Sequence, residues 1–184
     1  MAEALSGKRV AILVADGFEQ VEMTEPRAAL ESAGARTQIV SPADGRVQGW
    51  KHFDKADVFP VDVPLNGANA SEFDALLLPG GVANPDQLRV NSKAVAFVRS
   101  FFDAGKPVAA ICHAPWTLVE AGVVAGRRLT SWPSLKTDLM NAQARWEDAE
   151  VVTDNGLVTS RKPDDIPAFN RKMIEEFAEG RHSA

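Results

Sequence analysis

The sequence predicts an α/β fold in which helices cover both faces of a doubly wound, mostly parallel sheet. Short apolar runs rich in branched residues alternate with longer segments of helical character, which is the pattern of parallel strands joined by crossover helices. Two of these runs are apolar almost throughout, as expected of strands buried on both faces. The chain has 184 residues, 45% of them hydrophobic, and shows no linker or internal repeat, so we expect one domain over residues 1–184.

The first part of the chain predicts two strands with a helix between them. Arg9 to Val14 forms the first strand, and a helix runs from shortly after Glu19 to Ser32, where a glycine stops it. Thr37 to Val40 forms the second strand. Val47 to Pro64 has a glycine, prolines and no helical period, so we expect irregular strand and loop at one side of the sheet.

The middle of the chain predicts strands and helices in alternation. Asp74 to Leu78 is a buried strand, Ser92 to Ala104 a helix, and Pro107 to Ile111 a second buried strand. Pro115 to Ala121 forms a short helix, because proline is tolerated in a first turn and a glycine follows the last residue. The residues that follow the two strands therefore belong to the carboxyl edge of the sheet.

The last part of the chain predicts three short strands and a helix. Leu129 to Ser131, Glu150 to Thr153 and Leu157 to Thr159 have strand character. Asp154-Asn155-Gly156 is typical of a hairpin turn between the last two of them. Pro167 to Glu179 is predicted to be a final amphipathic helix.

The composition excludes several classes of protein. A net charge of -5 and a pI near 5.2 provide no positive field for nucleic acid. No stretch approaches the ~20 apolar residues that cross a bilayer, and the run from Val10 to Ala15 is too short for a secretory signal, so we expect a cytoplasmic protein without a membrane partner. One cysteine cannot form an internal disulfide, and no zinc, phosphate-loop or dinucleotide motif is present, so we expect no metal and no cofactor.

A cysteine and a histidine directly follow the second buried strand. Cys112 would lie on a sharp turn between strand and helix, as in a nucleophile elbow, where the helix end stabilises a thiolate. A lone cysteine on an apolar strand is also a common buried hydrophobe, and His113 can simply cap the turn. Gly80 and Gly81 end the other buried strand, where exposed amides can approach a ligand.

Three acidic residues are candidates to assist this thiol. Glu19 and Glu22 follow the first strand and, on a helical start, share one face, while Asp86 follows the diglycine turn. Acidic residues also favour the first turns of helices and the residues of loops, so each has a structural role as its alternative. His52 and His182 are interpreted as surface groups rather than ligands.

Five segments together resemble the ThiJ/PfpI superfamily, most closely its branch of PfpI-type intracellular proteases and deglycases. The segments are Asp16 to Glu22, Phe73 to Gly81, Ala110 to Pro115, Gly126 to Trp132 and Thr159 to Arg161. The resemblance extends over nearly the whole chain and implies a flavodoxin-like fold of the class I glutamine amidotransferase type.

The resemblance also implies roles at the strand ends. Cys112 matches the reactive cysteine of the family, and Glu22 matches the acid that hydrogen-bonds its thiol, with Glu19 one turn earlier. The backbone amides of Gly81 and His113 match the oxyanion site.

In the protease-like members the cysteine and histidine work with an acid from a neighbouring subunit, which matches Asp86. Asp86 is shorter than the Glu of the thermophilic prototype, and Ala114 stands where Gly is more usual, so both departures weaken the assignment as a peptidase. Family members form dimers or larger homo-oligomers, and we expect the same here. Trp50, His52 and Phe53 are a candidate contact patch.

Three functions are compatible with such a site. The favoured one is a stress-response enzyme of the cofactor-independent glyoxalase or protein deglycase type. In it the Cys112 thiolate adds to a small aldehyde such as methylglyoxal, or to a glycated protein or peptide, and Glu22 or His113 moves the proton. The alternatives are an intracellular cysteine peptidase with His113 as base, and a non-enzymatic redox sensor or chaperone, because an accessible thiol of low pKa is what oxidation to sulfinic acid selects.

Overall fold

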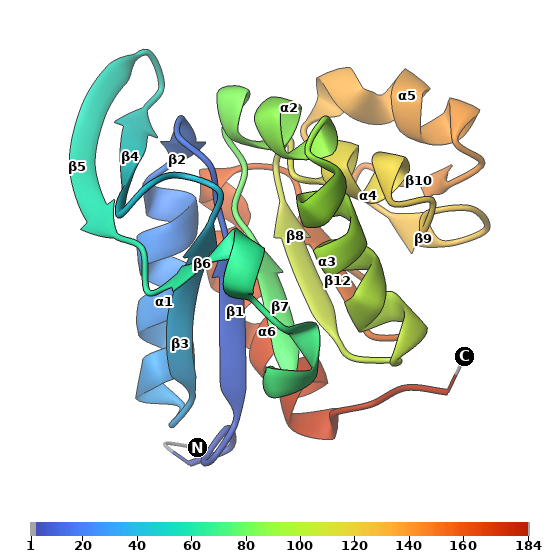
Figure 1. Cartoon of the computed structure of the whole chain (residues 1–184). Coiled ribbons are helices and arrows are strands. Elements are labelled where there is room, and N and C mark those ends of the chain that lie inside the picture. Colours follow the sequence, from blue (N-terminus) through green and yellow to red (C-terminus); the bar gives the residue numbers. More distant parts are fainter. Residues whose placement is uncertain (1–2, 184) are drawn as a thin grey trace.

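The computed structural model describes residues 3–183 and contains a central seven-stranded sheet. The strand order is β11-β12-β8-β7-β1-β3-β6, and only β11 runs antiparallel to its neighbour (Figure 1). The predicted α/β class with a mostly parallel sheet and helices on both faces is therefore confirmed. None of the described helices is long and apolar enough to span a bilayer.

The elements have the following bounds. The central strands are β1 (Arg9–Leu13), β3 (Arg36–Ser41), β6 (Val63–Pro64), β7 (Ala75–Leu78), β8 (Val108–Ile111), β11 (Val152–Asp154) and β12 (Leu157–Ser160). Two smaller sheets contain β2 (Phe18–Glu19), β4 (Arg46–Lys51) and β5 (Asp54–Pro60), and β9 (Arg128–Leu129) and β10 (Arg145–Trp146). The α-helices are α1 (Val21–Ser32), α2 (Ala83–Arg89), α3 (Ser92–Asp103), α4 (Pro115–Glu120), α5 (Lys136–Asn141) and α6 (Ile166–Glu179).

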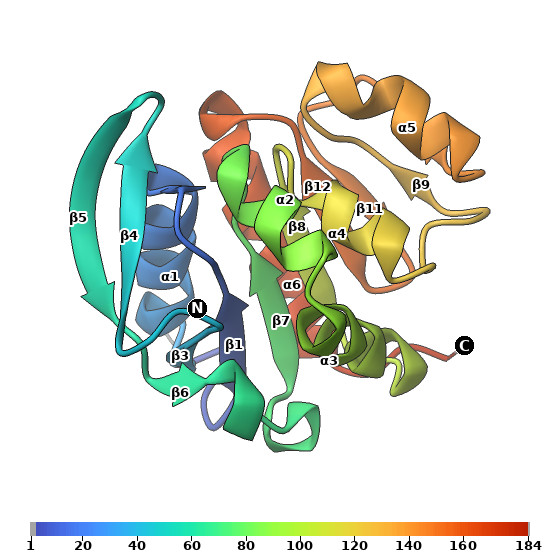
Figure 2. The same ribbon diagram turned by 45° about the horizontal axis from the view of Figure 1, so that its top comes forward.

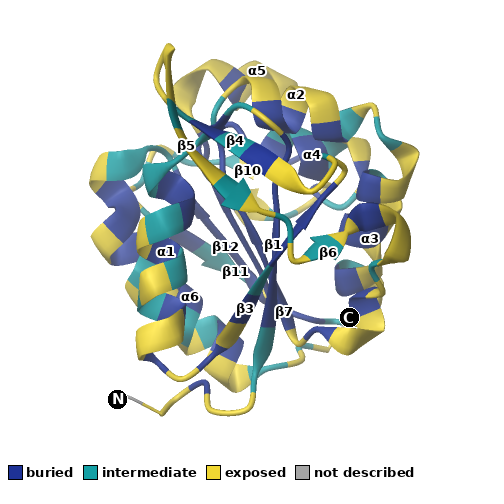
Figure 3. Cartoon of the chain, turned by 60° about the vertical axis from the view of Figure 1, so that its left-hand side comes forward, coloured by how far each residue is buried: buried dark blue, intermediate teal, exposed yellow. Residues whose placement is uncertain are grey.

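The core has two halves because side chains of a strand alternate between the two faces of the sheet. On β1, Ala11 and Leu13 pack toward α3 and α4, while Val10 and Ile12 pack toward α1 and α6. All four side chains are fully buried. The central strands accordingly lie in a buried layer between helices that expose their outer faces (Figure 3).

The segment from Val47 to Pro64 corrects one prediction. Instead of irregular strand and loop, β4 and β5 form a regular antiparallel hairpin, with one register shift between Gln48 and Trp50. Most of β5 is exposed, so the segment lacks the apolar alternation by which a half-buried strand is recognised. The hairpin pairs with β2 and lies at the carboxyl edge of the sheet, on the opposite side of α2 from α5 (Figure 2).

Three further differences concern short elements. The helices α2 and α5 were not expected, and both are too short for a clear apolar period. Leu129 belongs to a separate pair of strands, β9 and β10, instead of the main sheet. The predicted hairpin between β11 and β12 is confirmed, and Asn155 and Gly156 have φ values of 45° and 83°, as a two-residue turn of this kind requires.

Candidate active site

The ends of β1, β7 and β8 meet around one cavity of about 550 Å³. Strand order reverses between β1 and β7, and ligands of open α/β sheets bind outside such switch points. The cavity is lined by Glu22, Gly81 and Cys112 from the interior of the site and by aromatic side chains at its rim. The structure thus brings the predicted strand-end residues together.

Cys112 lies on the predicted turn between β8 and α4. Its φ is 64°, a left-handed conformation that residues other than glycine rarely adopt. Two backbone hydrogen bonds hold it there: the Cys112 N–H donates to Ser160 O at 3.0 Å, and the Trp132 N–H donates to Cys112 O at 2.9 Å. The residue is 7% exposed, so the thiol is reached only through the cavity.

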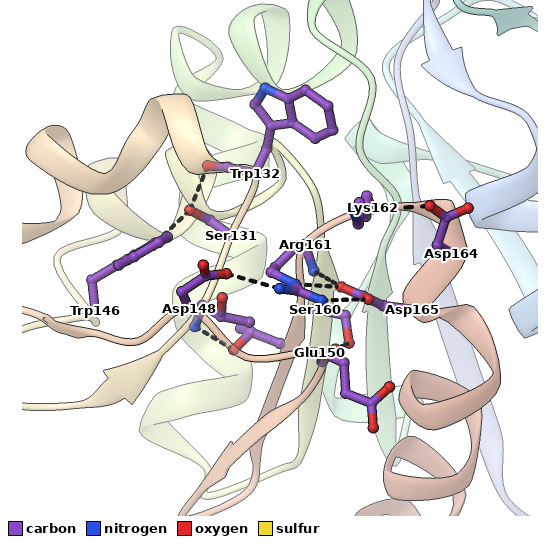
Figure 4. Close-up of polar contacts among 12 residues, drawn as sticks. Ser131, Trp132, Trp146, Asp148, Glu150, Ser160, Arg161, Lys162, Asp164 and Asp165 are labelled. Carbon is purple, nitrogen blue, oxygen red and sulfur yellow. Dashed lines mark hydrogen bonds and ion pairs between the residues drawn. The ribbon is translucent and has the colours of Figure 1, made fainter.

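The segment that follows β12 is held by an arginine. Arg161 donates to both carboxylate oxygens of Asp165, at 2.9 and 3.0 Å, and to Asp148 Oδ1 at 2.8 Å (Figure 4). Its own backbone N–H also donates to Asp165. This fixes the chain directly after Ser160, whose carbonyl is the acceptor for the Cys112 amide.

Gly80 allows the end of β7 to lie directly against the cysteine. A Cβ atom at this position would come within 2.7 Å of both Cys112 Cβ and Ile111 O, and within 2.9 Å of Glu22 Oε1. Any side chain here would push the two strand ends apart. The close backbone approach expected of the diglycine turn is therefore a contact with Cys112 and not with a ligand. This contact brings the Gly81 amide within hydrogen-bonding reach of the sulfur.

Asn84 fixes the direction of this diglycine turn. It is fully buried, accepts a hydrogen bond from the Ala15 N–H at 2.7 Å, and donates to Pro79 O at 2.9 Å and Gly80 O at 3.0 Å. One side chain thus ties the end of β1 to the end of β7 and orients the peptide that carries the Gly81 N–H.

We expect Asn84→Ala to lower the free energy of unfolding by about 2 to 3 kcal/mol, because it leaves a buried amide and two carbonyls without their partner. Urea unfolding followed by circular dichroism measures this change. Asn69→Ala is the matched control, because Asn69 is exposed and accepts only a local hydrogen bond from Ser71. Equal stability of the two variants would show that Asn84 does not hold the strand ends together.

Glu22 is a buried carboxyl next to the thiol. It is fully inaccessible, and burial raises its pKa to about 8, with the charge of Glu19 adding to the effect and the Cys112 thiol and Gly81 amide opposing it. Within residues 3–183, neither carboxyl oxygen of Glu22 makes a hydrogen bond of good geometry, although the Cys112 thiol and the Gly81 amide lie close by. Glu22 is therefore largely protonated at neutral pH and can donate that proton.

The thiol itself does not rest as the stabilised thiolate that the sequence predicted. Burial raises the pKa of Cys112, and the negative charge of an ionised Glu22 would raise it further, while the amides of Gly81 and His113 donate to the sulfur and lower it. The helix α4 spans only Pro115–Glu120, so its end contributes little. At neutral pH Glu22 is largely protonated, so this repulsion is largely absent.

His113 is the nearest group that can accept the thiol proton. Its Nδ1 lies 3.1 Å from Cys112 Sγ, and burial lowers the pKa of the imidazole to about 4. The ring is therefore neutral at neutral pH and has a free acceptor nitrogen in one of its tautomers. It packs between Trp116, edge to face at 5.2 Å, and Trp132, stacked at 5.8 Å.

The remaining predicted residues surround this centre. Glu19 belongs to β2 and not to the helix, so it does not share a helical face with Glu22; its Oε2 accepts the His52 N–H at 3.0 Å. Asp86 lies in the first turn of α2 and lines the cavity, but it makes no hydrogen bond to His113 within residues 3–183. His52 is exposed at the cavity rim beside Trp50 and Phe53.

A second group of titratable side chains lies at the end of α6. Candidate ligand atoms of Glu176, Glu179 and His182 lie within 4.8 Å of one another, and His182 Nε2 is 3.2 Å from Glu176 Oε2. None of the three lines the cavity of Cys112. His182 is thus half-buried beside Glu176, whereas the sequence suggested a surface group.

Two residues of the site were not singled out from the sequence. Trp132 covers His113, and its only signal was its place in a family-like segment, Gly126 to Trp132. Asn84 follows the diglycine turn and reads as a loop residue, because a sequence does not show that a polar side chain will be fully buried.

Known proteins resemble this chain over most of its length. A family model described as the DJ-1/PfpI family matches residues 8–176. A deglycase of Pyrococcus abyssi is 45% identical over 91% of this chain and 98% of its own length. A Bacillus subtilis protein provisionally named as a cysteine protease is 41% identical over 91% of this chain and 96% of its own. The crystal structure of Drosophila melanogaster DJ-1beta has a TM-score of 0.83 and 32% identity, over 93% of this chain and 90% of that one.

Proposed function

The chain belongs to the DJ-1/PfpI family, and from this and the geometry around Cys112 we propose that it is a cysteine-dependent enzyme acting on reactive carbonyl compounds. The observation that carries the proposal is the set of groups around one sulfur: a neutral imidazole at 3.1 Å, a buried carboxyl and two backbone amides. The relative named as a deglycase supports the same substrate class.

The first step is addition of the thiol to an aldehyde. The S–H bond of Cys112 breaks as the sulfur bonds to the carbonyl carbon; the proton goes to His113 Nδ1 and the π electron pair of the C=O bond goes to its oxygen. The amides of Gly81 and His113, which lie within hydrogen-bonding reach of the sulfur, are the donors that we assign to this oxyanion. Glu22 then gives its proton to this oxygen, and the product is a hemithioacetal on Cys112 beside a Glu22 carboxylate and a protonated His113.

The second step is an internal rearrangement. For methylglyoxal, the former aldehyde carbon loses a proton and its neighbour gains one, so that one carbon is oxidised, the other is reduced, and a lactate thioester results. The Glu22 carboxylate left by the first step takes the proton from the former aldehyde carbon and returns it to the neighbouring carbon, while protonated His113 gives its proton to the ketone oxygen and the hydroxyl proton of the former aldehyde passes to Glu22. Glu22 suits this exchange because it is buried beside the sulfur with a pKa near 8. Water then hydrolyses the thioester, and the same addition to a carbonyl adduct on a protein side chain leads to deglycation.

Product analysis on the unmodified chain tests this function. The protein is incubated with methylglyoxal without glutathione, and separately with methylglyoxal-modified N-acetylarginine, and lactate is measured. We expect lactate in both, and no lactate after complete alkylation with iodoacetamide, which has one thiol to react with. Absence of lactate from both substrates, or turnover that survives alkylation, rules the function out.

A cysteine peptidase of the PfpI type is the second candidate, because the contact between Sγ and Nδ1 also suits a thiol and its general base. A peptide with a fluorogenic leaving group separates the two candidates. Cleavage that Asp86→Ala abolishes supports the peptidase with its third residue, whereas full cleavage in this variant excludes that arrangement. Assembly as a homo-oligomer and a cytoplasmic location stay predictions, and native mass spectrometry tests the first.

A further inference from the structure

Trp132 covers the imidazole that faces the reactive sulfur. The two rings lie nearly parallel, with their centroids 5.8 Å apart and an angle of 21° between their planes. Trp116 lies at 5.2 Å from the same imidazole, in an edge-to-face arrangement. His113 is thus confined by two aromatic side chains, one of which is anchored directly to the cysteine backbone.

A chain of hydrogen bonds holds Trp132 in this place. The Trp146 Nε1–H donates to Ser131 Oγ at 2.9 Å, the Ser131 hydroxyl donates to Trp132 O at 2.8 Å, and the Trp132 N–H donates to Cys112 O at 2.9 Å. The links through Ser131 are visible in Figure 4. Because Pro133 follows, the backbone of Trp132 is also restricted to the polyproline-like conformation that it adopts, with φ -52° and ψ 133°.

The position of this ring has a steric consequence for His113. An imidazole turns about its Cβ–Cγ bond, and such a turn would drive its edge into a ring stacked on its face. The turn would also move Nδ1 away from the sulfur, from which it is now 3.1 Å distant. Trp132 is only half-buried, at 39% exposure, so a purely structural need for a large core side chain does not explain it.

We propose that Trp132 is a positioning residue that keeps the His113 imidazole neutral and turned with Nδ1 toward Cys112 Sγ, and so prepares it to accept the thiol proton. The role of His113 as proton acceptor rests on the proposed function. The packing of Trp132 on the imidazole does not depend on any substrate. A residue that only formed a wall for substrate would leave the imidazole unaffected when removed.

The charged groups around His113 do not account for its lowered pKa. Cys112 touches the imidazole, and Glu22, Glu19, Asp86 and His52 line the same cavity from α1, β2, α2 and the β4–β5 turn. Arg89 packs on Trp116, and Asp138 accepts the hydrogen bond of its indole. The depressed pKa of His113 is nevertheless explained by burial, and the two rings packed on the imidazole are those of Trp116 and Trp132.

Titration of His113 by NMR tests the inference. The chain has three histidines, and His52→Gln and His182→Gln assign the signals of the other two. We expect the pKa of His113 to be about 4 in the wild type. In Trp132→Ala it should rise by ~1 unit or more toward the ordinary value, and Trp132→Phe should restore it to within ~0.3 unit. Trp50→Ala, at the rim of the same cavity, should leave it unchanged.

An unchanged pKa in a folded Trp132→Ala variant overturns the inference, as does a shift of the same size in Trp50→Ala. If Trp132→Ala fails to fold, Ser131→Ala replaces it, because it removes only the hydroxyl that links Trp146 to Trp132. It should raise the pKa by ~0.5 unit, and no rise contradicts the inference. Since no substrate is present, a failure of the carbonyl chemistry would leave this result interpretable.

Discussion

Cys112→Ser is expected to reduce lactate formation from methylglyoxal by at least ~10³-fold, because a serine hydroxyl is a much weaker nucleophile at neutral pH. The substitution changes one atom, and the elbow conformation, the contact with His113 and the amides of Gly81 and His113 can all persist. The loss should therefore appear in kcat. Coupled detection of lactate at several substrate concentrations separates kcat from KM.

The control for this variant is its own stability. Cys112 is 7% exposed and packs in the core half that faces α1 and α6, so an altered fold would appear as a lowered melting temperature. We expect a small change in the melting temperature beside the ~10³-fold loss of turnover. Turnover close to that of the wild type would show that the sulfur takes no part in the reaction.

Glu22→Gln is expected to stabilise the protein at neutral pH by about 3 kcal/mol while it lowers kcat by about 10²-fold. The pKa of Glu22 is raised from 4.5 to about 8 in the folded chain. The stability associated with this shift is fully present below pH 4.5 and is lost as the pH rises toward 8. Glutamine has the size of the protonated acid and cannot ionise in the unfolded chain, so the variant avoids the loss.

Chemical unfolding between pH 4.5 and 8 measures the effect. The two stability curves should nearly coincide at the acidic end and separate by ~1.4 kcal/mol per pH unit above it. Glu25→Gln is the matched control, because Glu25 lies on the same helix α1 but is exposed. Parallel curves for the wild type and Glu22→Gln would mean that the carboxyl is not held protonated by the fold.

The sequence predicted the sheet because burial leaves a strong pattern in the central strands. Leu76 to Leu78 and Val108 to Ile111 are buried on both faces and read as continuous apolar runs. The β4–β5 hairpin was missed for the opposite reason. Its strands are held in part by polar contacts, such as the paired hydrogen bonds between the side chain of Gln20 and Asp57, and these have no periodic signal.

The candidate site was predicted in its members but not in its electrostatics. The carboxyl ends of parallel strands share one edge of the sheet, so residues that follow different strands are expected to meet there. The structure places four of them around one cavity: Cys112, His113, Glu22 and Gly81. The direction of the pKa shift of Cys112 depends instead on how deeply the turn is buried. Gly80 contributes to this burial because it lies in contact with the cysteine. A contact between the ends of two strands leaves no periodic pattern in the sequence.

The left-handed backbone of Cys112 means that the residue best for stability at this position is not the residue that the proposed reaction needs. Its φ of 64° costs a residue with a side chain about 1 kcal/mol, which glycine would not incur. Selection for a robust fold alone would therefore favour glycine here and erase the thiol. Related chains that lack the proposed reaction should therefore carry glycine at this position more often than chains that retain it.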